Sequence, residues 1–297
     1  MSAPATTYGG QAVIEGVVIR GRRTLALACR RPNGGIYRYR EPLRSILHRS
    51  RAARLPFARG IFTLWETLSF GMRMLMKSAD IQMEDERSSA PSAGTTAATT
   101  GVIVIAVAFG LGLFVGVPYL ASELLGRFVE SELLLNVLEG LLRLVLFLGY
   151  LVAISFMPDI RRVFAYHGAE HMTIHAFEHG DPLDAAHITP YPTAHPRCGT
   201  AFLLLVVLVS IALFAFLPRT NVVVDLLARL LLVIPVAAIA YEVLRFGARH
   251  ERHPLMRMLV APGLFLQRLT TRRPDDGMIE VAVASLQEAL AGDEAAA

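Results

Sequence analysis

The sequence predicts a membrane fold that is mainly α-helical, with four transmembrane helices, interfacial helices and a small cytosolic β-hairpin or meander unit. Of its 297 residues, 54% are hydrophobic, and its mean hydropathy of +0.47 exceeds that of ordinary soluble proteins. Four apolar stretches approach the ~20 residues that a helix needs to cross ~30 Å of hydrocarbon. The N-terminal residues MSAPATTYGG lack an apolar h-region, so we expect insertion to depend on internal segments.

The β-unit is expected over residues 8–50. The stretch AVIEGVVI is rich in β-branched residues, and two further strand-like stretches, TLALACRRP and IYRYREPL, flank Asn33-Gly34-Gly35. Asn and Gly tolerate positive φ, so this tripeptide is a strong hairpin signal. The arginines between these strands should stay solvated or meet lipid headgroups.

Residues 57–79 are predicted to form an amphipathic helix that lies at the membrane interface. A polar stripe recurs at helical spacing, and a broad apolar arc that includes Trp65 covers the rest. A fifth membrane span is the alternative for this segment. Residues 86–100, ERSSAPSAGTTAATT, are small and polar and are expected to be a flexible linker.

The predicted spans form two pairs. Transmembrane helices 1 and 2 are expected within 101–157, and helices 3 and 4 within 200–244. A cytosolic histidine-rich helix and loop is expected over 158–199, and cytosolic or interfacial C-terminal helices over 245–291. Arginines concentrate in the N-terminal region, the 158–199 loop and the tail, so the positive-inside rule places both termini and the histidine-rich loop in the cytosol.

Charge and cysteine content restrict the partners. The formal net charge is +4, and arginine is dense before residue 60, which suits anionic lipid headgroups at a basic cytosolic face. No recognition motif with interleaved aromatics is visible, so we expect no nucleic acid partner. The two cysteines, Cys29 and Cys198, are too few for a secreted disulfide framework. A protein partner is not identified by the sequence.

Charged residues also occur inside the predicted spans. Glu139 and Arg143 stand at i and i+4 in the second span, and Arg229 enters the fourth at similar depth. The simpler interpretation is that these charges neutralise one another. The more specific interpretation is that they line a path for a substrate or for protons.

The segment HGAEHMTIHAFEH, residues 167–179, is the candidate functional site. If it is helical, His167 and His171 lie one turn apart on one face, with Glu170 beside them. Two imidazoles can then reach one metal ion while a carboxylate activates water. His167-Gly-Ala-Glu170-His171 also matches the H-x-x-E-H pattern of inverzincin metallopeptidases. The alternative without a metal is a solvated, pH-responsive histidine cluster.

Three further residues are expected on the same side of the membrane. His195 and Cys198 stand at the cytosolic mouth of the third span and could complete a metal shell. Glu242 lies at the cytosolic end of the fourth span, where a carboxylate needs a partner. It is a candidate ligand, with a salt bridge to Arg245 or Arg249 as the structural alternative. For Cys198 the structural alternative is a small buried residue.

Five segments together resemble the YqhQ-like family of bacterial membrane proteins: GGQAVIEGVVIRG, YHGAEHMTIHAFE, HPRCGTAF, AYEVLR and APGLFLQRLTTRRPDD. The resemblance runs from about residue 8 to 291. That family is a domain of unknown function with the generic label predicted metal-dependent enzyme. By resemblance the signature positions here are His167, Glu170, His171, His195, Arg197 and Cys198. Met172 stands where a lysine is expected, and His175 and His179 look like local additions.

The resulting prediction is a multi-pass protein of the bacterial plasma membrane with a metal-dependent, hydrolase-like site on its cytosolic face. A divalent metal, with zinc expected first, would be bound by His167, His171, His195, Cys198 and Glu242. Glu170 would act as the general base, and Arg197 would hold an anionic substrate group. An iron oxidoreductase is ranked lower, because the histidines form one dense segment only. The main alternative is a non-enzymatic scaffold or assembly factor with a structural metal or a pH-responsive histidine cluster.

Overall fold

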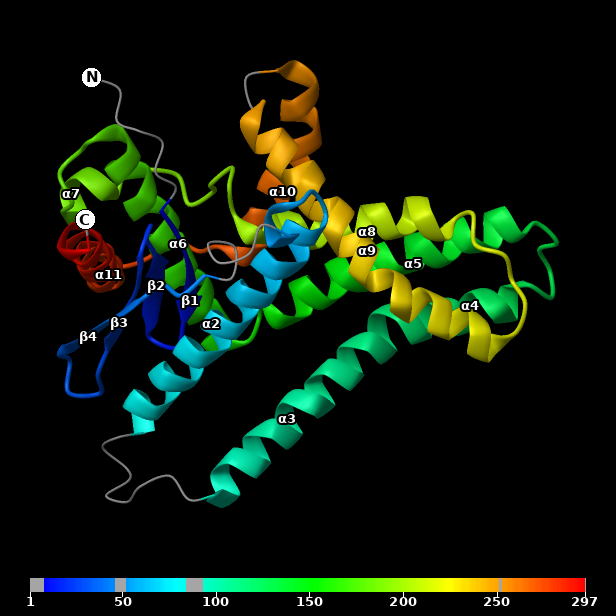
Figure 1. Cartoon of the computed structure of the whole chain (residues 1–297), viewed down its shortest axis with the longest axis horizontal. Coiled ribbons are helices and arrows are strands. Elements are labelled where there is room, and N and C mark those ends of the chain that lie inside the picture. Colours follow the sequence, from blue (N-terminus) through cyan, green and yellow to red (C-terminus); the bar gives the residue numbers. More distant parts are fainter. Residues whose placement is uncertain (1–7, 46–51, 84–92, 251–252, 297) are drawn as a thin grey trace.

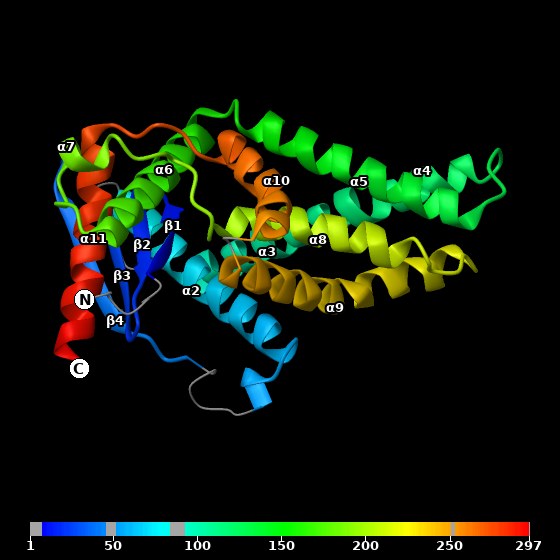
Figure 2. The same cartoon turned by 90° about the horizontal axis from the view of Figure 1, so that it is seen from above.

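The computed structural model describes residues 8–45, 52–83, 93–250 and 253–296 (Figure 1). One end holds a four-stranded sheet with its covering helices, and the other end is a helical bundle (Figure 2). The elements are β1 (Gly9–Val13), β2 (Gly16–Arg20), β3 (Thr24–Arg30), β4 (Ile36–Pro42), η1 (Ala52–Arg54), α2 (Ala58–Met83), α3 (Ala93–Leu111), the π-helix η2 (Gly112–Gly116), α4 (Val117–Leu125), α5 (Glu132–Ile154), α6 (Pro158–His179), α7 (Ala185–Ile188), α8 (Gly199–Phe214), α9 (Val222–Arg249), α10 (Pro254–Thr270) and α11 (Asp276–Ala295).

The sheet is an antiparallel meander in the order β1-β2-β3-β4. The hairpin predicted at Asn33-Gly34-Gly35 joins β3 to β4, and Gly34 has a φ of 86°. The stretch AVIEGVVI is two strands rather than one, because the chain turns at Ile14 and Glu15, with Val13 paired to Gly16. Glu15 takes a φ of 51°, a left-handed conformation that non-glycine residues seldom adopt.

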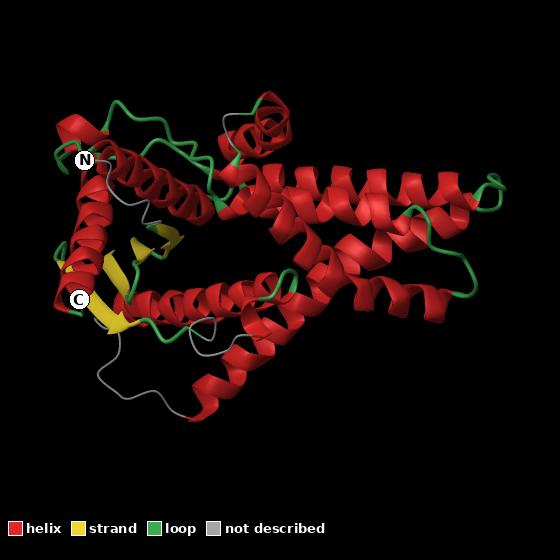
Figure 3. Ribbon diagram, turned by 45° about the horizontal axis from the view of Figure 1, so that its top comes forward, coloured by secondary structure: helices red, strands yellow, loops and turns green. Residues whose placement is uncertain are grey.

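Helices cover both faces of the sheet. Side chains alternate between faces along a strand, so Val17 and Ile19 pack with α6 and α11, whereas Val18 packs with Met74 of α2. The C-terminal helix α11 docks on the sheet, with Leu286 fully buried. Figure 3 shows the strands gathered at one end, among helices that stand apart from the long bundle. The sheet therefore holds α6 and α2 on opposite sides.

The turn at Glu15 is tied to α6 by a bidentate ion pair. Arg162 donates from Nε and Nη2 to the two carboxylate oxygens at 2.5 Å each, and the Tyr166 hydroxyl donates to the same group at 3.2 Å. Hydrogen bonding from Arg162 holds the pKa of the Glu15 carboxyl below its usual range. This contact links the first hairpin to the histidine-bearing helix.

Replacing Glu15 with glutamine should lower stability at neutral pH and weaken its acid dependence. Because the folded-state pKa is depressed, the stabilisation is present above the unfolded value of ~4.3 and disappears as the pH falls through the folded value. For a partly exposed pair we expect a loss of about 1 kcal/mol at pH 7. Thermal unfolding in detergent from pH 7 to pH 3 checks this. A difference in melting temperature between the two proteins that stays the same at every pH would contradict it.

Three helical segments are long and apolar enough to cross a membrane: Gly101–Leu125, Glu132–Ile154 and Val222–Gly247. The third predicted span differs from expectation, because α8 has only 16 residues, short of the ~20 needed for a full crossing. It ends at Phe214, four residues before Pro218, which cannot continue a helix. The described residues therefore support three spans and one shorter apolar helix.

The linker expected over 86–100 is also corrected in part. Helix α3 begins at Ala93, so residues 93–100 are helical rather than flexible, and residues 86–92 lie outside the described residues. Three alanines in this stretch favour helix, and an apolar helix follows directly, so that elongation needs no new nucleus.

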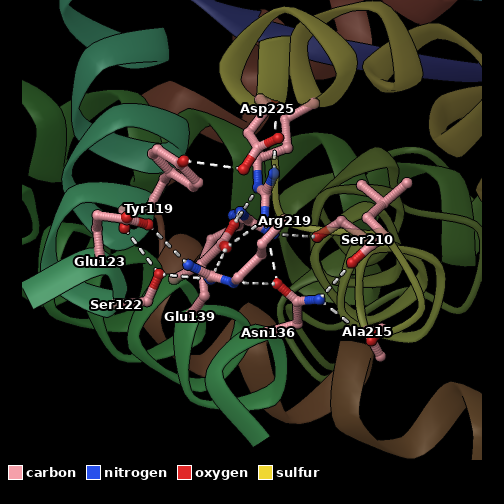
Figure 4. A network of polar contacts seen from close by, with 12 residues as sticks. Tyr119, Ser122, Glu123, Asn136, Glu139, Ser210, Ala215, Arg219 and Asp225 are labelled. Atoms are coloured by element: carbon pink, nitrogen blue, oxygen red, sulfur yellow. Dashed lines mark hydrogen bonds and ion pairs between the residues drawn. The ribbon is translucent and has the colours of Figure 1, made fainter. Parts of the chain in front are cut away.

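The intramembrane charges form one network, drawn in Figure 4. Glu139, only 1% exposed, accepts from Arg143 at 2.7 Å, from Arg229 at 2.8 and 2.9 Å and from Arg219 at 3.1 Å. Asn136 accepts from Arg219 and Arg229. The ion pairing expected for Glu139, Arg143 and Arg229 is confirmed, and Arg219 joins it from the loop before α9.

A proline supplies one further partner to this network. Pro118 has no backbone N–H, so the carbonyl of Phe114 four residues earlier lacks its helical donor. Arg143 Nε donates to that carbonyl at 2.8 Å. Phe114 lies within the π-helical turn Gly112–Gly116, just before Pro118. A local backbone defect is thus satisfied by the buried guanidinium.

Candidate metal centre

Helix α6 carries the histidine segment and is defined at both ends. It starts with Pro158 at its first turn and stops at Gly180, whose φ of 78° is left-handed. His167, His171 and His175 follow at intervals of four and share one face of the helix. Gly168 allows close approach, because a Cβ there would overlap the carbonyl oxygen of Arg272. The segment between α10 and α11 therefore packs directly against the histidine turn.

One buried group brings together His167, His171 and Cys198. Their ligand atoms all lie within 4.8 Å of one another. His167 Nδ1 lies 2.9 Å from the carbonyl of Thr270, and His171 Nδ1 lies 2.6 Å from that of Thr193. A carbonyl can only accept, so in both rings Nδ1 carries the proton and Nε2 keeps its lone pair. Metal-binding histidines usually donate their other ring N–H to a backbone carbonyl in this way.

Cys198 reaches the cluster from the start of α8. It is the N-cap of that helix, and its sulfur accepts from the backbone N–H of Thr200 at 3.4 Å. Sγ lies 3.3 Å from His167 Nε2. Two ligands of a tetrahedral zinc ion, one nitrogen at ~2.0 Å and one sulfur at ~2.3 Å, stand about 3.5 Å apart. The donor set and its spacing therefore fit zinc.

Glu170 lies beside this group and is 4% exposed. Its Oε2 is 3.5 Å from His171 Nε2, and it accepts a backbone hydrogen bond from Gly10 of β1. Burial raises the pKa of the Glu170 carboxyl and lowers that of the His171 imidazole. The neutral imidazole is the form that binds metals.

A second group contains His175, Glu178 and His195. It differs from the first because Arg197 forms an ion pair with Glu178, so a cation already faces the only carboxylate of the group. His195 is held by a reciprocal pair of hydrogen bonds between its backbone and the buried amide of Gln267, at 2.7 and 2.9 Å. Among the described residues, His195 thus stands with the second group rather than with Cys198.

Glu242 does not join either group. Its carboxylate is bound by Arg59 at the start of α2, where Nε donates at 2.8 Å, and by the backbone N–H of Phe57 at 3.1 Å. The prediction of Glu242 as a metal ligand is not supported by this geometry. The salt-bridge alternative holds in kind but with another partner, because Arg59 comes from a segment 183 residues away.

A cavity of about 420 Å³ adjoins the cluster. Glu170, His171 and Cys198 line it, together with Arg197 and His195. Ile174 and Gly199 add to the lining from the histidine-rich region itself. The other walls come from elements that were not predicted to belong to the site, with Gly9, Gly10, Gln11, Val18, Arg20, Leu25, Thr63, Thr67, Phe70, Gly71 and Tyr241 among the lining residues. The polar stripe predicted for residues 57–79 was the only sequence signal that α2 has a hydrophilic face, which in the fold lies toward the cavity.

The fold and site define a mainly helical protein with three helices apolar enough to cross a membrane and a buried histidine–cysteine cluster beside the sheet. A family described as "Protein of unknown function (DUF1385)" matches residues 55–292. The chain is also 32% identical over 294 residues to "Uncharacterized protein YqhQ" of Bacillus subtilis (strain 168), covering 95% of this chain and 92% of that protein. No solved structure matches. The chain therefore belongs to the YqhQ-like DUF1385 family.

Proposed function

We propose that this protein is a metal-dependent hydrolase of the bacterial plasma membrane. The observation that carries the proposal is that ligand atoms of His167, His171 and Cys198 all lie within 4.8 Å of one another beside a cavity. Three protein ligands leave a tetrahedral zinc ion with one open position, as catalytic zinc sites do and closed structural sites do not.

The residues around the cluster have separable roles. A bound zinc ion would act as a Lewis acid and lower the pKa of a bound water. Glu170 lines the cavity within 3.5 Å of His171 Nε2, close enough to take a proton from a molecule at the cluster. Arg197 lines the same cavity and presents a guanidinium to an anionic substrate group. His195 holds its place through Gln267 and borders the cavity.

The site is proposed to face the cytosol. Arginine-rich segments before residue 60, over 158–199 and after 244 support this orientation through the positive-inside rule. β1 and α11 lie at the same end of the molecule as α6 (Figure 2), which agrees with both termini being cytosolic. The basic face there is suited to anionic lipid headgroups.

Zinc-dependent hydrolysis tests the proposal. Purified protein is assayed with p-nitrophenyl butyrate and bis(p-nitrophenyl) phosphate, before and after chelation and zinc addition. Replacing Glu170 with glutamine should keep the metal but lower the rate by about 10²- to 10⁴-fold, the usual contribution of a general base. Glu280, which is largely exposed and pairs with Arg30 away from the cluster, provides the matched Glu→Gln control and should leave the rate unchanged.

Two outcomes would contradict this function. An equal rate in the zinc-loaded Glu170→Gln protein would remove Glu170 from the chemistry. Activity that survives chelation but is lost on alkylation of Cys198 would instead favour a cysteine nucleophile, since Sγ lies 3.3 Å from His167 Nε2. A scaffold or assembly factor with a structural metal remains the alternative if zinc binds and neither probe is hydrolysed.

A further inference from the structure

On one side of the cavity, helix α2 alone separates the cavity from the outside of the molecule. Thr63, Thr67 and Phe70 stand three or four residues apart and line the cavity together with Gly71. Gly71 permits close contact with the sheet, because a Cβ there would overlap the side chain of Gln11 in β1. The inward face of α2 is thus part of the site.

The outward face of α2 is apolar and exposed. Trp65 and Leu68 are 67% and 70% exposed, and the same face is extended by Leu55, Phe57, Ile61, Phe62 and Met72. We call these seven residues the α2 arc. An apolar surface of this extent on one helix is characteristic of a membrane or partner contact.

The position of the α2 arc favours the bilayer as its neighbour. Its first residues are held at the end of a membrane-crossing helix, since the Phe57 N–H and the Arg59 guanidinium both bind Glu242 of α9. The apolar segment of α9 ends only five residues later, at Gly247. A surface that begins where a span ends is continuous with the lipid around that span.

Charge and size restrict what the cavity can hold. Arg20 and Arg197 both line it, paired with Glu66 and Glu178 respectively. Arginine is well suited to bidentate binding of phosphate, and both cationic side chains border the cavity beside the cluster. At about 420 Å³ the cavity falls within the ~300–1,000 Å³ range of small-ligand sites. That volume suits a polar headgroup but not the acyl chains of a lipid.

We propose that the cavity binds the anionic, phosphate-bearing headgroup of a bilayer lipid, which enters past α2 while its acyl chains lie along the α2 arc. This names the substrate class of the proposed hydrolase and rests on that function. Binding of the headgroup itself requires only the cavity, its arginines and the apolar arc. It can therefore be measured whether or not zinc is present.

Binding of short-chain lipids tests the proposal. Detergent-purified protein is titrated calorimetrically with dihexanoyl phosphatidylglycerol, dihexanoyl phosphatidylcholine and glycerol phosphate. The anionic lipid should bind at least about tenfold more tightly than either of the others, because only it offers both a net charge and chains. Replacing Thr67 with tryptophan fills the cavity and should abolish binding. The same replacement at Asp80, an exposed residue of α2 that belongs neither to the cavity lining nor to the α2 arc, should leave it unchanged.

Two controls keep the result interpretable. If the Thr67→Trp protein fails to fold, Arg20→Gln should still weaken binding of the anionic lipid by about tenfold through loss of a charge-assisted contact. Trp65 is the only tryptophan in the chain, so quenching of its fluorescence by brominated lipids in vesicles reports contact of the α2 arc with the bilayer.

Each remaining outcome would overturn the inference. Equal binding of glycerol phosphate would mean that the ligand is a soluble phosphate, and equal binding of phosphatidylcholine would remove the role of charge. Unquenched Trp65 would mean that the α2 arc faces a protein rather than lipid. The His167→Ala protein separates this proposal from the proposed function, because His167 is not among the cavity-lining residues and its loss should remove metal and hydrolysis while the lipid still binds.

Discussion

Replacing Glu139 with glutamine should be the most damaging single change within the membrane-crossing part. The variant leaves Arg143, Arg219 and Arg229 without their shared carboxylate, although Arg229 is fully buried. Removing one partner of a buried ion pair costs about 3–5 kcal/mol, because the other charges stay uncompensated. We expect thermal unfolding in detergent to begin on the order of 10 °C lower than in the wild type.

Glu123 provides the matched control for this change. It pairs with Arg219 at 3.2 Å in the same network, but its side chain is 50% exposed. Glu123→Gln should therefore cost less than about 1 kcal/mol. Removing both charges in Glu139→Leu/Arg229→Met should restore part of the stability, as replacement of buried ion pairs by apolar residues often does. Equal melting temperatures for Glu139→Gln and wild type would show that the network does not hold the helices together.

Replacing Cys198 with serine should remove the sulfur ligand from the metal site. Cobalt substituted for zinc gives a near-ultraviolet charge-transfer band only when a thiolate binds it, so the band should be present in the wild type and absent in the variant. Cys29 is the matched control, because it is also buried but lies in β3, and Cys29→Ser should keep the band. Glu242→Gln should keep it too, since that carboxylate binds Arg59.

Two other results of the cobalt experiment would change the assignment of the metal site. A band that persists in Cys198→Ser would require a different thiolate, and Cys29 is the only other cysteine in the chain. Bound cobalt without the band in the wild type would place the metal elsewhere, with the group of His175, Glu178 and His195 as the remaining cluster among the described residues. A band lost in Cys29→Ser would contradict the fold, because that cysteine lies in the strand pair β2–β3.

Local patterns predicted much of the fold and the centre of the site. Helical spacing was enough to put His167 and His171 on one face of the helix. Asn33-Gly34-Gly35 identified its hairpin through the φ values that the turn requires. These features depend on residues within one or two turns of each other, so they can be read from adjacent sequence.

Contacts between residues far apart in the sequence could not be predicted. Glu242 binds Arg59 across 183 positions, and no spacing rule connects the two residues. The contribution of α2 to the cavity was missed for the same reason, because the sequence showed a polar stripe but not which surface it faces. Likewise the sequence does not connect Arg219, in the loop before α9, to Glu139, which it binds in the fold. The start of α3 at Ala93 was misjudged, since small polar residues are typical of both linkers and helix ends.

The metal content of the purified protein tests the central claim most directly. Elemental mass spectrometry is applied to the wild type and to the His167→Ala/His171→Ala protein, with His187→Ala as a control, because His187 is exposed and pairs with Asp184 away from the cluster. We expect about one zinc per chain in the wild type and control and none in the double variant. A wild-type protein without metal after purification in zinc-supplemented buffer, or a double variant that retains the same zinc, would contradict it.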